Sequence, residues 1–163
     1  MSRAMHLQAN PTPFDRLAGG LLFRLVSLGL TPSRWPWTAG GTVILEVRGR
    51  RSRRLHSTLV TWVEHDRARY LVSMPGAEPQ WVKNARVAGG AVVLRHGTNR
   101  IRVSLAELPA AQRAPVLQAW YRVTGRSAPP RRHFGIDRSA PLAAFEHLAA
   151  AHPVFRILPA SQA

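Results

Sequence analysis

Hydrophobic residues recur at helical spacing near the start of the chain. Between Phe14 and Leu30 the apolar positions follow one another at steps of three and four residues, which predicts an amphipathic helix. Its apolar stripe consists of Phe14, Leu17, Leu21, Leu25 and Leu28. The segment is too short and too charged to span a membrane, and residues 1–13 lack the pattern of a signal peptide. We expect a flexible N-terminus over residues 1–13, then a helix that packs against the fold or makes a peripheral membrane contact through residues 14–30.

The hydrophobic pattern changes from helical to alternating at Thr42. Short stretches rich in β-branched residues are separated by turn residues, which predicts strands joined by hairpins. The predicted strands are Thr42–Val47, Ser57–Glu64, Arg69–Met74, Ala91–Arg95, Arg100–Leu108 and Val154–Leu158, with a short helix at Pro79–Val87. Residues 96–99, which include a glycine and an asparagine, suit a tight hairpin turn.

Two more helices are predicted before the last strand, at Pro109–Val123 and at Pro141–Ala151, the second with Ser139 as its N-cap. The segment Thr124–Ala140 between them is expected to be an ordered loop or lid. About six short strands with flanking helices predict a mainly β, α+β domain over residues 14–163, built as a small antiparallel barrel. The GxGxxG fingerprint is absent, which disfavours a nicotinamide-binding Rossmann domain.

The composition is strongly basic and free of cysteine. The formal net charge is +15, and 22 of the 23 basic residues are arginine, with Lys83 as the exception. An acidic partner is indicated, although a GC-rich genome would give the same preference for arginine. The lack of cysteine excludes disulfides and thiolate metal ligands and fits a reducing cytoplasm. The seven histidines show no metal-ligand spacing, so no metal site is predicted.

Five of the arginines lie in the nine residues from Arg48 to His56, between two predicted strands. A basic loop held between strands presents guanidinium groups and backbone N–H donors in a fixed geometry, as an anion-binding site requires. The plainer interpretation is a solvated basic loop. Nucleic acid is disfavoured as the anion, because the tryptophans do not interleave with the basic run as a stacking platform would require.

Several segments, taken in order, resemble the deazaflavin-dependent nitroreductase family, within the split β-barrel superfamily of flavin and deazaflavin oxidoreductases. They are the run from Val47 to Ser52, then Leu55, Ser57 and Thr58, the run from Tyr70 to Ser73, the run from Trp81 to Arg86, and the run from His152 to Arg156. The similarity covers most of the chain from Leu21 onward. The basic loop combined with Trp-x-x-Asn-x-Arg is its most specific part.

The resemblance implies a split β-barrel that binds coenzyme F420, a deazaflavin with a phosphate and a glutamate tail, in preference to FMN. Arg50, Arg51 and Ser52 would hold the phosphate, because the planar fork of arginine suits it better than lysine. Arg48, Arg53 and Arg54 would serve the tail. The strand residues Thr58, Leu59 and Val60 would lie beside the ring, and Ser57 just before them is a further expected cofactor-binding residue.

Further residues are assigned roles by the same resemblance. Ser73 is expected near the reactive ring carbon, where it would orient substrate as the candidate catalytic residue; the alternative is a serine that ends a strand. Trp81 would pack at the base of the pocket, while Asn84 and Arg86 would fix the loop or reach the cofactor. The candidates for proton donor are Tyr121, His133 and solvent.

The basic loop departs from the family pattern at three positions. Family members commonly have glycine where Arg53 stands, a basic residue where His56 stands, and proline near Leu59. If the turn needs positive φ at Arg53, a side chain there would be strained. The tyrosine-rich substrate segment of the nitroreductases is not matched by residues 131–135.

The expected activity is hydride transfer from reduced F420 to a small activated acceptor, such as a quinone, an enone or a nitro compound. The cofactor carries the reactive chemistry, so the lack of an evident catalytic dyad does not argue against an enzyme. The alternative is a barrel that binds a deazaflavin, a flavin or a lipid without turnover. The sequence leaves the oligomeric state open.

Overall fold

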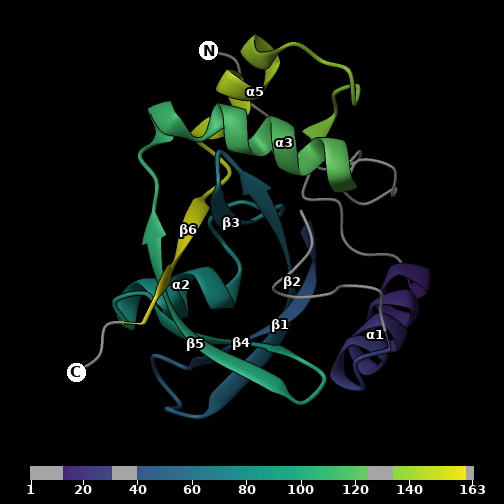
Figure 1. Ribbon diagram of the computed structural model, residues 1–163, viewed down its shortest axis with the longest axis vertical. Coiled ribbons are helices and arrows are strands. Elements are labelled where there is room, and N and C mark those ends of the chain that lie inside the picture. The colour runs from purple at the N-terminus through teal and green to yellow at the C-terminus, as the bar shows by residue number, and fades with distance from the viewer. Residues whose placement is uncertain (1–12, 31–39, 125–133, 161–163) are drawn as a thin grey trace.

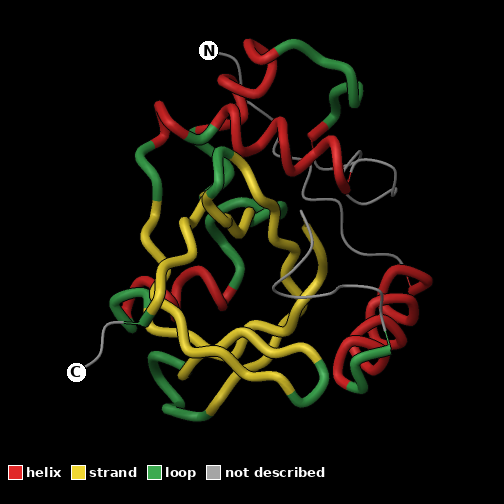
Figure 2. The backbone as a smooth tube through the Cα atoms, in the orientation of Figure 1, coloured by secondary structure: helices red, strands yellow, loops and turns green. Residues whose placement is uncertain are grey.

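The computed structural model describes residues 13–30, 40–124 and 134–160, and for residues 13–18 it describes the backbone alone. Its six strands are β1 (Gly40–Arg48), β2 (Leu55–His65), β3 (Ala68–Val72), β4 (Ala91–His96), β5 (Asn99–Glu107) and β6 (Val154–Pro159). They form a closed antiparallel barrel in the order β1-β2-β3-β6-β5-β4, visible as the ring of strands in Figures 1 and 2. The predicted six-stranded antiparallel split barrel is confirmed.

Alternation along the strands fills the barrel. Val43, Leu45 and Val47 of β1 are buried in one cluster with Val60 and Trp62 of β2. Because side chains alternate across a strand, residues two apart share the interior face, and the pairing register of β1 with β2 is fixed by this burial. The β1–β2 pairing extends to Arg48, the last residue of β1, and Leu55, the first residue of β2, so both ends of the turn between them are fixed by the sheet.

A tight turn joins β2 to β3. Asp66 and Arg67 have φ values of 47° and 59°, and the pair between His65 and Ala68 closes the hairpin. Two consecutive residues with positive φ are the requirement of a type I′ hairpin, whose twist matches that of the flanking strands. This turn lies at the far end of β2 from the basic loop.

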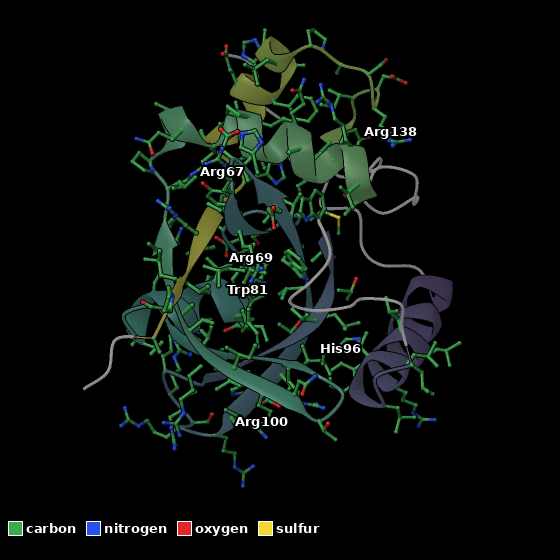
Figure 3. All side chains as sticks on the ribbon, viewed as in Figure 1. Arg67, Arg69, Trp81, His96, Arg100 and Arg138 are labelled. Carbon is green, nitrogen blue, oxygen red and sulfur yellow. The ribbon has the colours of Figure 1, made fainter. Side chains whose placement is uncertain are left out.

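Helix α2 (Gln80–Val87) packs into the barrel with one face. Trp81, Val82 and Ala85 belong to the interior cluster, and the Trp81 ring lies 5.4 Å from that of Phe155 on β6. Trp81 lies within the ring of strands in Figure 3. The opposite face of α2 is left for contacts with the basic loop.

Helices α3 (Ala114–Thr124) and α5 (Leu142–Ala149) pack on one another, and α3 also contacts β2 and β3, at the top of Figure 1. The prediction of one continuous helix from Pro109 to Val123 is wrong, because a short 3₁₀ helix, Ala110–Gln112, precedes α3. Pro115 lacks an N–H, so it suits the first turn of a new helix and cannot continue the earlier one.

The predicted cap of α5 is also wrong. The N-cap position is Pro141, which makes no side-chain capping bond. The hydroxyl of Ser139 donates instead to the Asp137 carboxylate, which also accepts the Ser139 backbone N–H. These hydrogen bonds lower the pKa of Asp137 and commit the serine to a local turn.

Helix α1 (Pro13–Ser27) lies beside β1 and β4 (Figure 1). Its packed residue is Val26, fully buried, whereas Leu21 and Leu28 of the predicted stripe are 61% and 68% exposed. The helix docks through its last turn, where the Gly97 N–H donates to the Val26 carbonyl at 2.9 Å. The expectation that the stripe packs was therefore wrong for these two leucines. No helix among the described residues is long and apolar enough to cross a membrane.

The expectations for residues 1–12, the Trp35-Pro36-Trp37 connector and residues 125–133 of the predicted lid lie outside the described residues. Phe134, just after that gap, is buried in the cluster formed by α3 and α5. The described end of the predicted lid is therefore part of a packed core.

Candidate functional site

The basic loop is a compact six-residue turn between β1 and β2. Two backbone hydrogen bonds close it: the Gly49 N–H donates to the Arg54 carbonyl at 2.8 Å, and the Arg53 N–H donates to the Gly49 carbonyl at 3.0 Å. Arg53 adopts φ +57° within this turn. The position does require the left-handed conformation, and it is occupied by an arginine at a cost that glycine would not incur.

Arg50 fastens the turn to helix α2. Its backbone N–H donates to Asn84 Oδ1 at 3.2 Å, and its guanidinium Nη1 donates to Gln80 Oε1 at 2.8 Å and to Asn84 Oδ1 at 3.0 Å. Gln80 and Asn84 are four residues apart, so they lie on the same face of the helix. The orientation of the turn is therefore set by two amides of α2.

A cavity of about 260 Å³ lies between the turn and α2. The residues that line it are Gly49, Arg50, Arg51, Ser52, His56, Gln80 and Asn84. This is smaller than the usual pocket for a whole ligand, which starts at roughly 300 Å³. The cavity therefore suits one group of a larger molecule.

Gly49 forms a side of the cavity on which no side chain fits. A Cβ placed there would lie 2.6 Å from His56 Nε2 and 2.7 Å from Ser52 Oγ. These two polar atoms are hydrogen-bonded to one another at 3.1 Å. The Ser52 hydroxyl also accepts the Arg54 backbone N–H at 3.3 Å.

Several donors at the cavity are available to a ligand. Arg51 is exposed, and its guanidinium has no hydrogen-bond or ion-pair partner within the described chain. The backbone N–H groups of Arg51 and Ser52 likewise have no acceptor among the described residues. The lining contains two arginines and no carboxylate. Cationic and neutral N–H donors that converge without an acidic partner fit a phosphate group.

The structure thus places four of the expected cofactor-binding residues around one cavity: Arg50, Arg51, Ser52 and Asn84. The Arg54 side chain is exposed and does not line it. On β2, Ser57 is exposed, Thr58 and Leu59 are half-buried, and Val60 is buried in the barrel interior. These strand residues follow the cavity along β2 and do not line it.

Ser73, the candidate catalytic residue, directly follows β3 and is 1% exposed. Its hydroxyl donates to the Gly76 carbonyl at 2.5 Å, and its backbone N–H donates to the Pro153 carbonyl at 2.9 Å. The carbonyl of Ser73 lies 3.3 Å from His152 Nδ1. This geometry favours the alternative interpretation, in which the serine closes the turn after the strand.

Arg86 is turned away from the cavity toward β5. Its Nε and Nη2 bind the two oxygens of Glu107, both at 2.8 Å, and Arg113 Nη2 binds the same carboxylate at 3.0 Å. The hydrogen bonds between Arg86 and Glu107 are the main cause of two shifts: they lower the pKa of Glu107 and raise the pKa of Arg86. The neighbouring Trp81 packs in the barrel interior. Both residues support α2, which in turn holds the basic loop.

Two of the candidate proton donors can be placed. The Tyr121 side chain is fully buried, and its hydroxyl donates to the Ile136 carbonyl at 2.8 Å. His133 lies outside the described residues. A buried hydroxyl that already donates to a carbonyl is a poor source of a transferable proton.

Sequence reasoning did not select three residues that line the cavity: Gly49, His56 and Gln80. Gln80 stands four residues before Asn84, a spacing that would have placed both on one helical face. The contact of His56 with Ser52 has no comparable signal, because it depends on the conformation of the turn.

Comparison with known proteins places the chain in a family. Residues 30–145 match the family model described as F420H(2)-dependent quinone reductase. The protein belongs to the F420H2-dependent quinone reductase family. It is an oxidoreductase and its cofactor is coenzyme F420. The resemblance to deazaflavin-dependent split-barrel oxidoreductases is confirmed, as are the enzyme class and the cofactor.

Other comparisons are more distant. An F420 reductase of known structure shares 12% identity over 74% of this chain and 86% of its own, with a TM-score of 0.44. A FAD-binding protein from Mesorhizobium loti shares 18% identity over 88% of each chain, with a TM-score of 0.45. A structure described as a domain-swapped dimer shares 18% identity over 90% of this chain and 99% of its own, with a TM-score of 0.46. Such distant similarities add nothing to the assignment of function. No curated protein matches the chain.

Proposed function

We propose that this protein transfers a hydride from F420H2 to a quinone, with an enone or a nitro compound as alternative acceptors. The family match supports a quinone as the acceptor. When bound, the reduced deazaflavin supplies the hydride, so the protein has to bind, orient and shield it. The observation that carries the proposal is the cavity at the arginine turn, whose lining fits the phosphate that this cofactor bears.

The residues at the cavity have two different roles in the proposed binding of the phosphate. Arg51, with the backbone N–H groups of Arg51 and Ser52, provides donors that are not engaged within the described chain. Arg50 is partly engaged with Gln80 and Asn84, so it serves mainly to fix the turn against α2. The backbone N–H groups are held in place by the closed turn before the ligand arrives, so they lose little conformational entropy on binding.

Titration of the purified full-length protein with oxidised coenzyme F420 tests the proposal, with tryptophan fluorescence as the readout and FMN as the control. We expect saturable binding of F420 that is tighter than the binding of FMN. If F420 does not bind, the proposed site is wrong. Single-turnover oxidation of F420H2 by menadione then tests the acceptor, with cyclohexenone and a nitroaromatic compound as comparisons. Equal rates with all three would contradict a quinone preference.

We also infer that the N-terminal helix contacts a lipid surface, as would suit a lipid-soluble acceptor. Leu21 on α1, and Leu28 and Leu30 just after its end, are 61%, 68% and 66% exposed, and Arg24 of the same helix is exposed as well. Exposed leucines beside a cation are typical of a helix that lies on an anionic membrane. Sedimentation with vesicles that contain phosphatidylglycerol should carry down the wild type and release the Leu21→Ser, Leu28→Ser double variant. Equal sedimentation of both proteins would refute this inference.

A further inference from the structure

Ser52 and His56 are exposed residues that form a hydrogen-bonded pair in the lining of the cavity at the arginine turn. The Ser52 hydroxyl and the His56 ring nitrogen Nε2 lie 3.1 Å apart, and both residues line the cavity. The pair packs against the backbone of Gly49, where a Cβ would come within 2.7 Å of both polar atoms. A backbone surface without a side chain therefore brings this pair together.

The charge of the imidazole decides what the serine can donate. The Ser52 hydroxyl oxygen already accepts the Arg54 N–H at 3.3 Å, which leaves one lone pair and one proton. In the neutral tautomer whose Nε2 carries no proton, His56 accepts a hydrogen bond from the Ser52 hydroxyl. In the imidazolium both ring nitrogens are donors, so Nε2 donates to the serine and the hydroxyl proton turns free. Protonation of that tautomer thus adds a cation to the cavity and frees the Ser52 hydroxyl proton as a second donor.

We propose that Ser52 and His56 act as one anion-binding unit that strengthens the hold on the cofactor phosphate when the imidazole is protonated. This rests on the proposed binding of F420 at the arginine turn. A histidine here makes the affinity for the phosphate depend on pH, whereas the basic residue of the family pattern would give a constant cation. Imidazole groups change charge between about pH 5 and pH 8, within the range that a cell experiences.

The groups around His56 favour this assignment. Of the four arginines in the turn, Arg50 and Arg51 line the cavity and Arg53 and Arg54 do not, so all the charges that the turn brings near His56 are positive. Helix α2 contributes Gln80 and Asn84, both uncharged. On β1 the residue paired with His56 is Val47, which is apolar. The lining of the cavity offers no carboxylate to hold a permanent ion pair with the imidazolium. A bound phosphate would be the counter-ion.

Calorimetric titration with oxidised F420 from pH 5.5 to pH 8.0 tests the proposal on three proteins: wild type, His56→Arg and His56→Gln. The arginine stays charged and the glutamine stays neutral, so any titration of the cofactor itself appears equally in both. We expect the wild-type affinity to rise about fivefold more toward low pH than that of either variant, as an exposed charge pair allows. A pH dependence shared by all three proteins would overturn the proposal.

A second readout does not depend on a variant. The NMR titration midpoint of the His56 Cε1–H signal, assigned by its loss in His56→Gln, should move to higher pH when F420 is bound. By linkage, a fivefold difference in affinity corresponds to a shift of about 0.7 pH unit. An unchanged midpoint would refute the role of His56. Should F420 fail to bind at all, or bind Arg51→Ala as tightly as wild type, the placement of the cofactor would be wrong, which is a separate outcome.

Discussion

Replacing Arg53 by glycine should stabilise the protein, because this arginine is held in a conformation that costs L-residues energy. Its φ is +57°, imposed by the two backbone hydrogen bonds that close the turn at Gly49. The left-handed conformation costs roughly 1–2 kcal/mol for a residue with a Cβ. Glycine relieves that cost and loses about 0.5–1 kcal/mol through the greater freedom of the unfolded chain. The net gain is therefore about 0.5–1 kcal/mol.

A matched control lies at the other end of β2. Arg67 has φ +59° in the β2–β3 turn, so Arg67→Gly removes the same charge and relieves the same strain far from the cavity. Both variants should unfold at higher urea concentration than wild type, with a rise in the melting temperature of roughly 1–4 °C for a chain of this size. Arg53→Ala keeps the Cβ and should bring no gain. If Arg53→Gly is less stable than wild type while Arg67→Gly is more stable, the turn does not have the conformation described.

Two further predictions concern the contacts that fix helix α2 against β5 and the basic loop against α2. Glu107→Gln should cost about 1–3 kcal/mol, because the nine-tenths buried Arg113 loses the carboxylate that it binds. The folded-state pKa of Glu107 is lowered, so its contribution is present above the unfolded-state value of about 4.3 and is lost as the pH falls through the folded-state value. Urea unfolding from pH 7 to pH 3 should therefore show a smaller loss of stability in Glu107→Gln than in wild type; equal losses would contradict this. Asn84→Ala removes the acceptor of two Arg50 hydrogen bonds and should weaken F420 binding several-fold in fluorescence titration, whereas an unchanged Kd would show that the turn needs no anchor.

The barrel could be predicted from the sequence because its causes are local. Alternating β-branched residues and short turns specify hairpins, and a chain of hairpins closes into an antiparallel barrel. The turn between β1 and β2 could also be predicted, since the arginine-rich run lies between two stretches that alternate as strands do. The strained position was also foreseen, because Arg53 stands where glycine is common in the family.

The remaining features depend on contacts between distant parts of the chain. Arg50 and Arg51 are neighbours with the same chemistry, yet Arg50 is bound by helix α2, 30 residues further on, and Arg51 is free for a ligand within the described chain. The exposed Leu28 follows from the docking of α1 through its last turn, where Gly29 approaches Gly97. The burial of Ser73 depends on the loop at Gly76, which accepts its hydroxyl. No periodicity in the sequence encodes these contacts.

The central claim is that the arginine turn holds the phosphate of coenzyme F420, and the salt dependence of binding tests it most directly. The Kd for oxidised F420 should be measured between 50 and 500 mM salt for the wild type and for two variants, Arg51→Ala and Arg67→Ala. Each substitution removes one positive charge, and the two sites lie at opposite ends of β2. We expect Arg51→Ala to bind about tenfold more weakly at low salt and to lose part of the salt dependence, since a charge-assisted hydrogen bond is removed. Arg67→Ala should match wild type. Equal weakening by the two substitutions would mean that F420 responds to net charge alone, and that the phosphate is bound elsewhere.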